Sequence, residues 1–157
     1  MTRLYGRALG GQRMVDATPH GHWSTTTLIS ALRVDGSTAD MVIDSATDGT
    51  VFLTYVEKIL APTLKPDDIV IMDNLASHKM ATVVAVIQAT GAKVRFLPPY
   101  SPDLNPLEKM WSKIKAYLRK VKARTKETLW QAIGSALKTV TASDALNWFI
   151  ACGYTQS

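Results

Sequence analysis

Cysteine and long apolar segments are scarce in this chain of 157 residues, and their scarcity excludes several classes of protein. The single cysteine, Cys152, leaves no partner for a disulfide within the chain. The N-terminal residues MTRLYGRALGG contain no apolar stretch of the kind found in signal peptides or membrane spans. We therefore expect a cytoplasmic protein in a reducing compartment, with no membrane segment.

The overall composition is that of an ordinary globular protein. Hydrophobic residues make up 46% of the chain and charged residues 20%, values that disfavour both disorder and a fibrous architecture. The length suits one domain with a real core, and we find no repeat or low-complexity linker that would divide it. We expect a single domain over residues 1–157, with a basic helical part that begins at about residue 105.

Acidic residues are missing from one window, residues 109–126. This window holds eight of the 18 basic residues and none of the 13 acids. Clustered Lys and Arg bind nucleic acid by displacing its counterions, so the window is a candidate DNA-binding surface. A solvated helix face is the alternative for a charge run considered alone. The candidate DNA-binding residues are Lys109, Lys113, Lys115, Arg119, Lys120, Lys122 and Arg124.

Hydrophobic periodicity predicts an alternation of strands and helices that share one α/β core. The turn signal Asp35-Gly36 joins two strands into a hairpin. The predicted elements are strands over 25–33 and 41–43, a helix over 50–60 ended by Pro62, a strand over 68–73, a helix over 80–90 stopped by Gly91, a strand over 94–97, and helices from 105 to the C-terminal region.

Asp73 follows the wholly apolar run Ile69–Met72, which is typical of a strand buried on both faces in a parallel sheet. Ligands of open α/β sheets bind outside the carboxyl ends of such strands, so Asp73 is a candidate catalytic and metal-binding residue. The alternative is structural, because an aspartate after a strand commonly accepts hydrogen bonds from the following turn.

Glu108 begins a predicted helix directly after the run LPPYSPDLNP at 97–106, which carries four prolines and must form a stiff loop. This loop would hold Glu108 at a set distance from the strand edge that carries Asp73. A capping box with Asn105 is the alternative role for Glu108. Helical spacing also places Lys115, Arg119 and Lys122 on roughly the face of Glu108, beside an apolar face that would pack into the core.

Two segments together, MDNLASHK at 72–79 and FLPPYSPDLNPLEKMWSKIK at 96–115, resemble the DDE transposases of bacterial insertion sequences related to the mariner group. Weaker likeness extends to GRALGGQR at 6–13 and ISALRVDG at 29–36. The resemblance implies a ribonuclease-H-like fold, a mixed sheet flanked by helices. It also implies that Asp73 and Glu108 are the second and third catalytic acids and bind Mg²⁺ or Mn²⁺. His78 and Asn74 match the pattern that follows the second acid.

In that family the first catalytic aspartate lies on the first, central strand, ahead of the segment that corresponds to residues 3–13. The sequence has no such residue there, so we expect an N-terminally truncated domain that lacks this strand. Its absence would expose sheet edges. Other acids follow later in the pattern, and none is assigned to the site: Asp16, Asp35, Asp40, Asp44 and Asp48. His20 and His22, two positions apart, are a weak candidate metal pair for which a surface role is the alternative.

Two functions remain open from the sequence. The first is DNA transposition, with metal-dependent strand cleavage and transfer by a homodimer bound to insertion-sequence ends and target DNA, inactive alone because the first acid is absent. The second is a non-catalytic DNA-binding or inhibitory remnant. The sequence does not reveal which terminal repeats or which target sequence would be recognised.

Overall fold

A β-hairpin lies at the centre of the computed structural model, which describes Gly10 and residues 25–154. Strands β1 (Thr27–Leu32) and β2 (Thr38–Ile43) pair antiparallel, with Leu32 opposite Thr38 and Thr27 opposite Ile43. The turn between them uses Gly36 at φ +85°, as the Asp35-Gly36 signal predicted. β2 begins earlier than predicted, because pairing with β1 extends a segment whose own residues are only weakly patterned.

The predicted helix from Thr50 forms, but its end differs from the prediction. Helix α1 (Gly49–Tyr55) is capped by Asp48, whose side chain accepts a hydrogen bond of 2.8 Å from the Val51 N–H. It continues as a π-helical turn (Val56–Leu60) and a 3₁₀ turn (Ala61–Thr63). Pro62 lies inside this last turn, near its start, where a missing N–H is tolerated.

A βαβ unit follows, made of β3 (Ile69–Met72), α2 (Ala81–Ala89) and β4 (Lys93–Phe96). The two strands are parallel, with Ile69 beside Lys93 and Met72 beside Phe96. Gly91, at φ +85°, lies in the turn before β4, where the helical pattern was predicted to stop. The predicted strands and helix of this region are confirmed.

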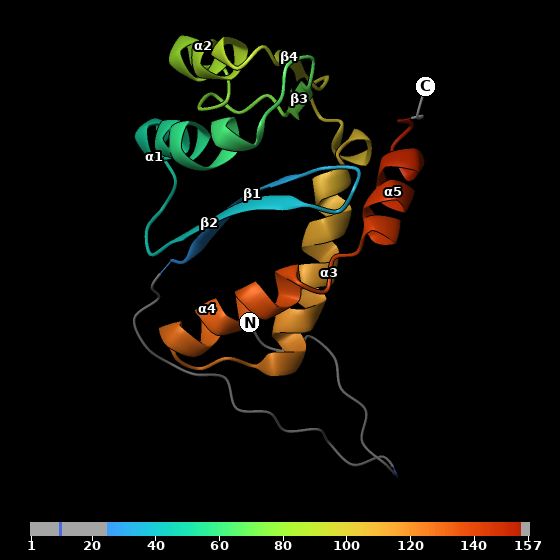
Figure 1. The fold of residues 1–157 in the computed structure, drawn as a ribbon. Coiled ribbons are helices and arrows are strands. Elements are labelled where there is room, and N and C mark those ends of the chain that lie inside the picture. The colour runs from blue at the N-terminus through green and yellow to red at the C-terminus, as the bar shows by residue number, and fades with distance from the viewer. Residues whose placement is uncertain (1–9, 11–24, 155–157) are drawn as a thin grey trace.

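Three helices complete the described chain (Figure 1): α3 (Pro106–Val121), α4 (Lys126–Leu137) and α5 (Ala142–Ala151). A short 3₁₀ turn, Pro102–Leu104, precedes α3. Thr125 and Thr141 begin α4 and α5 with reciprocal capping boxes. None of the helices in the described part of the chain is long and apolar enough to cross a membrane.

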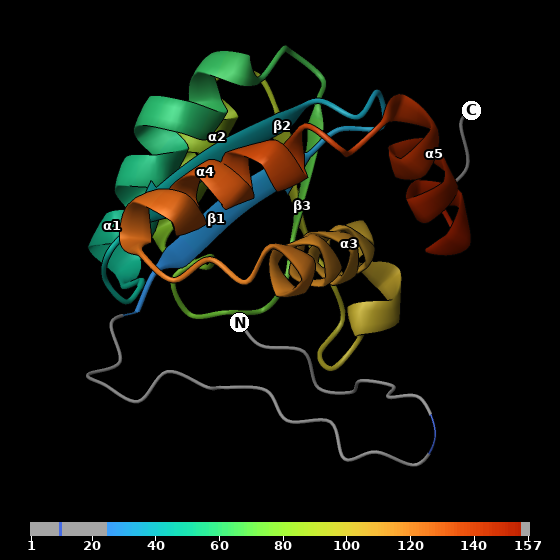
Figure 2. The same cartoon turned by 90° about the horizontal axis from the view of Figure 1, so that it is seen from below.

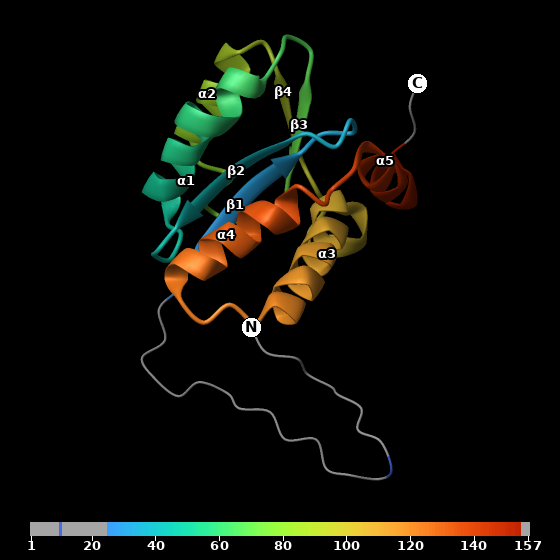
Figure 3. The ribbon, with the colours of Figure 1, turned by 60° about the horizontal axis from the view of Figure 1, so that its bottom comes forward.

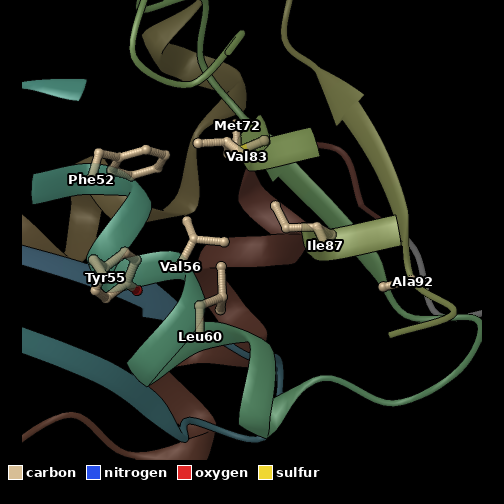
Figure 4. Packing of buried hydrophobic residues seen from close by; sticks show 8 residues of the cluster. All are labelled: Phe52, Tyr55, Val56, Leu60, Met72, Val83, Ile87 and Ala92. Carbon is tan, nitrogen blue, oxygen red and sulfur yellow. The ribbon is translucent and has the colours of Figure 1, made fainter. Parts of the chain in front are cut away.

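The hairpin separates two hydrophobic clusters. In Figure 1 α1 lies on one side of it, and Figure 2 shows α4 lying across the other side. Ile29 and Ala31 of β1 pack with the first cluster, whereas Leu28 and Leu32 pack with the second. The first cluster, shown in Figure 4, consists of Phe52, Tyr55, Val56, Leu60, Met72, Val83, Ile87 and Ala92. The second consists of Met110, Ile114, Leu118, Ala132, Ile133 and Ala136.

The described strands form two small sheets, one of β1 and β2 and the other of β3 and β4. The mixed α/β class is therefore confirmed, whereas the expected single mixed sheet is not formed by these residues. The two sheets lie next to each other, as Figure 3 shows, but β1 and β3 are not hydrogen-bonded neighbours.

Candidate active site

Asp73 lies at the carboxyl end of β3, directly after Met72, and 44% of its side chain is exposed. Its Oδ1 accepts a hydrogen bond of 3.1 Å from the Leu75 N–H, so it does hold the following turn. The loop is also tied to β4, because the Asn74 amide donates to the Leu97 carbonyl and the Leu97 N–H donates to the Met72 carbonyl. These bonds fix the backbone that carries the carboxylate.

Glu108 is in the first turn of α3, where the helix dipole favours a negative charge. The Asn105 side chain caps the helix by accepting the Leu107 N–H at 3.1 Å, and Pro106 occupies the first turn. Among the described residues the exposed Glu108 carboxylate accepts no hydrogen bond, so the return bond of a capping box is not formed. The capping role proposed as an alternative for Glu108 is therefore confined to its backbone.

The proline-rich loop brings the two acids to one hollow. Asp73 and Glu108 both line a cavity of about 430 Å³, whose wall includes Pro98, Pro99 and Tyr100. The loop is anchored at one end by buried Leu97 and at the other by the Tyr154 hydroxyl, which donates to the Leu104 carbonyl at 2.9 Å. The sequence-predicted pair thus shares one concave site with a rigid wall.

His78 supports Asp73 from the side of the core. Its Nδ1 lies 2.6 Å from Asp73 Oδ1, but the ring N–H is not aligned for a hydrogen bond, and Nδ1 is otherwise unpartnered and buried. The imidazole packs on the Phe52 ring with 4.2 Å between ring centroids. This support by Phe52 was missed in the sequence, because nothing in the pattern of α1 shows which loop it will meet.

The donor set of the site fits a hard divalent cation only in part. Carboxylate oxygens are the ligands that Mg²⁺ prefers, and the ion commonly keeps several waters beside one or two protein carboxylates. Asp73 and Glu108 can supply those two. Within the described residues, however, no group of three or more His, Cys, Asp or Glu side chains is placed to hold a metal.

The other acids of the hairpin region are occupied by structural contacts. Asp35 accepts from the Ser37 N–H and hydroxyl, and these bonds lower its pKa. Asp40 accepts from Ser30 and Thr38, and Asp48 caps α1. Asp44 bonds Thr26 and Trp130 and pairs with Lys126 at 3.2 Å. None of the four lines the hollow of about 430 Å³, whereas Asp35 is on the wall of a larger cavity of about 1340 Å³ that Asp73 and Glu108 also line. Asp16, His20, His22 and, apart from Gly10, segment 6–13 lie outside the described residues.

The predicted DNA-binding residues divide into two groups in the structure. Lys113 is turned to α5, where its ammonium lies 2.6 Å from Asp144 and donates to the Thr139 carbonyl at 2.7 Å. It holds the pKa of Asp144 at about 2. Lys109, Lys115 and Lys120 are exposed on α3, and Arg119 is half-buried. Lys122 ends α3 at φ 53°, and Arg124 is exposed in the connection to α4.

Comparison with known proteins identifies one family. The family described as DDE superfamily endonuclease matches the chain over residues 1–130. The matched region includes Asp73, the proline-rich loop, Glu108 and the whole of α3. None of the curated proteins compared with the chain matches it. Because the family match covers most of the sequence and both candidate acids, the chain belongs to the DDE superfamily of endonucleases.

Proposed function

We propose that this chain is the catalytic part of a mariner-related insertion-sequence transposase that cuts and joins DNA with Mg²⁺ or Mn²⁺. Family membership implies DNA as the substrate, a divalent metal and a ribonuclease-H-like fold. The observation that carries the proposal is the shared hollow of Asp73 and Glu108 at the carboxyl end of β3. Joining two element ends further favours a homodimer.

Each part of the site has a chemical task in this proposal. Asp73 and Glu108 would hold the metal, and its chemistry there would be to activate a water or a DNA 3′-hydroxyl and to stabilise the leaving oxygen. The Leu75 N–H fixes the orientation of the Asp73 carboxylate, and the His78 ring lies against it. The exposed cations of α3 follow Glu108 along the helix and bind backbone phosphates, whereas Lys113 fixes α5 to α3.

We further assign the remaining catalytic acid to a central strand that the described residues do not provide. Two carboxylates alone leave the metal weakly held, and the acids Asp35, Asp40, Asp44 and Asp48 have structural partners away from the hollow. The chain by itself is therefore expected to bind DNA but not to cut it. Among the described residues no third acid lies at the hollow, and this observation equally favours a second function, that of a DNA-binding or inhibitory remnant.

Metal-dependent nicking of supercoiled DNA tests the proposal. The chain is compared with a version extended at its N-terminus by a strand that ends in an Asp-Glu pair, each with Mg²⁺ or Mn²⁺. Only the extended version is expected to nick, and Asp73→Asn or Glu108→Gln should abolish its activity while leaving DNA binding intact. Asp103→Asn is the matched control, because this exposed acid of the same loop does not line the hollow.

The outcomes separate the two functions. If the extended version keeps its nicking activity after either substitution, the assignment of Asp73 and Glu108 as catalytic acids would be refuted. Nicking by the unextended chain, abolished by Asp73→Asn, would show that a residue outside the described range supplies the third ligand. Absence of nicking in both versions, with DNA binding retained, would favour the remnant.

A further inference from the structure

The C-terminal helix α5 packs against α3, the helix that begins at the candidate site. Figure 1 shows the two helices next to each other, with the chain after α5 close to the 3₁₀ turn Pro102–Leu104. The family match ends at residue 130, before α5 begins at Ala142. The match by itself therefore assigns no role to α5, and a role has to be sought in its contacts.

Tyr154 follows α5 and joins it to the proline-rich loop. Its hydroxyl donates to the Leu104 carbonyl at 2.9 Å, although the two residues are 50 positions apart. The ring meets that of Phe149 edge to face, with 5.7 Å between centroids, and the Tyr154 N–H donates to the Phe149 carbonyl at 3.0 Å. Burial raises the pKa of the Tyr154 hydroxyl, so it remains a protonated donor at neutral pH.

The carbonyl that Tyr154 holds lies directly before the start of α3. Leu104 ends the 3₁₀ turn, in which the Leu104 N–H donates to the Ser101 carbonyl at 3.2 Å and the Asn105 N–H to the Pro102 carbonyl at 3.1 Å. Asn105 then caps α3, and its carbonyl accepts the Glu108 N–H at 3.1 Å. A chain of backbone hydrogen bonds therefore leads from the Tyr154 hydroxyl to Glu108.

The two ends of the proline-rich loop are fixed by different side chains. The end nearer Asp73 is held by the Asn74 amide, which donates to the Leu97 carbonyl. The other end, nearer Glu108, is held by the hydroxyl of Tyr154. The prolines between these ends restrict φ and transmit a shift rather than absorb it. Releasing one end should therefore change the separation of the two acids.

The support for Tyr154 is itself firmly placed. Near the start of α5, Asp144 forms an ion pair of 2.6 Å with Lys113 of α3, which also donates to the Thr139 carbonyl at 2.7 Å. The hairpin turn lies against the same end of α5, since a Cβ added to Gly36 would come within 2.8 Å of the Ala142 nitrogen. These contacts join α5 to α3 and to the hairpin.

We propose that Tyr154 is a positioning residue for Glu108, because its hydroxyl fixes the Leu104 carbonyl and thereby the place of the Glu108 carboxylate relative to Asp73. In this role Tyr154 acts through the backbone of the loop and contacts no reacting atom. The inference rests on the proposed function, in which the two acids hold a divalent metal.

Tyr154→Phe in the whole chain tests the inference, since it removes the hydroxyl and keeps the ring that packs on Phe149. Amide exchange followed by NMR should become at least tenfold faster at Asn105 and Glu108. In a titration with Mn²⁺ alone, paramagnetic broadening is measured at the Asp73 and Glu108 amides. The ratio of broadening at Glu108 to that at Asp73 should fall at least twofold, which a general loss of metal affinity would not cause.

Tyr55→Phe is the matched control. The Tyr55 hydroxyl donates to the Ala39 carbonyl at 2.9 Å, so the control loses a hydrogen bond of the same kind and length from the first hydrophobic cluster. Both variants should lower Tm by similar amounts. Only Tyr154→Phe should change amide exchange at Glu108 and the ratio of Mn²⁺ broadening.

Two results would overturn the inference. Exchange and broadening in Tyr154→Phe equal to those of the unmodified chain would show that the hydroxyl does not position Glu108. Equal changes in Tyr55→Phe would show that loss of stability explains them. If Mn²⁺ broadens neither acid in the unmodified chain, the proposed metal site fails, and amide exchange at Glu108 alone decides whether Tyr154 positions this residue.

Discussion

Replacing Lys115 and Arg119 together by alanine tests whether the exposed face of α3 binds the DNA backbone. The two residues are four positions apart and therefore neighbours on the helix, on the face that also carries Glu108. Lys115 is exposed and Arg119 half-buried. Removing both should weaken DNA binding without unfolding α3, because neither is among its buried residues, which are Pro106, Met110, Ile114 and Leu118.

The magnitude follows from counterion release. Each phosphate contact contributes about −0.9 to the slope of log K against log salt concentration, so two contacts contribute about −1.8. Between 50 and 200 mM salt, the unmodified chain should therefore lose about 12-fold more affinity than the double variant. At 0.1 M salt the variant should bind up to about 60-fold more weakly.

Anisotropy of a labelled DNA duplex, titrated at several KCl concentrations, measures both quantities. The matched control is the double variant Lys58→Ala/Lys138→Ala, which loses the same two charges from exposed positions outside residues 109–126. If the salt slope of the Lys115/Arg119 variant equals that of the unmodified chain, α3 does not bind the backbone. If the control loses as much affinity, net charge rather than this helix explains binding.

Three further predictions concern stability. Lys113→Met should destabilise the fold by about 1 kcal/mol at pH 7, because the ammonium holds the pKa of Asp144 at about 2, below its ordinary 3.8. Because the pKa of Asp144 is lower in the folded protein, its carboxylate stabilises the fold above about pH 4, and this contribution is lost as the pH falls toward 2. The Tm of the variant should therefore fall less steeply with pH over that range than the Tm of the unmodified chain. Equal slopes for the two would refute this. Gly36→Ala should cost about 1–3 kcal/mol in urea unfolding, since φ is +85° and the new Cβ would lie 2.8 Å from the Ala142 nitrogen; an unchanged midpoint would contradict it. Met110→Ala, at a fully buried position, should cost about 2–5 kcal/mol by the same measurement, and a loss below 1 kcal/mol would show that the second cluster closes around the gap.

Local signals predicted most of the secondary structure. The apolar run before Asp73 and the turn at Gly91 predicted β3, α2 and β4 correctly. An unbroken apolar run is typical of a strand buried on both faces, and glycine is typical of a turn with positive φ. The predicted end of the helix at Pro62 was wrong by a few residues, since Pro62 fits near the start of a 3₁₀ turn that continues to Thr63. The positions of Asp73 and Glu108 at one hollow followed from strand order and loop stiffness.

Contacts between segments far apart in the chain could not be predicted from the sequence. Lys113 belongs by spacing to the basic window, yet Asp144, 31 positions later, lies against its ammonium. Likewise Arg33 and Asp68, 35 positions apart, join the two sheets, and Phe52 lies under His78. Each depends on how whole elements pack, which the charge and hydropathy of neighbouring residues do not specify.

The placement of the hairpin between two clusters has a consequence for synthesis of the chain on the ribosome. The first cluster uses residues from 29 to 94, so it can assemble early, whereas the second needs residues 107 to 148. At about 5–20 residues per second, the interval between the two is about 3–11 seconds. For that time Leu28, Leu32 and Val42 lack their complete helical cover, so the nascent hairpin is expected to expose this apolar face.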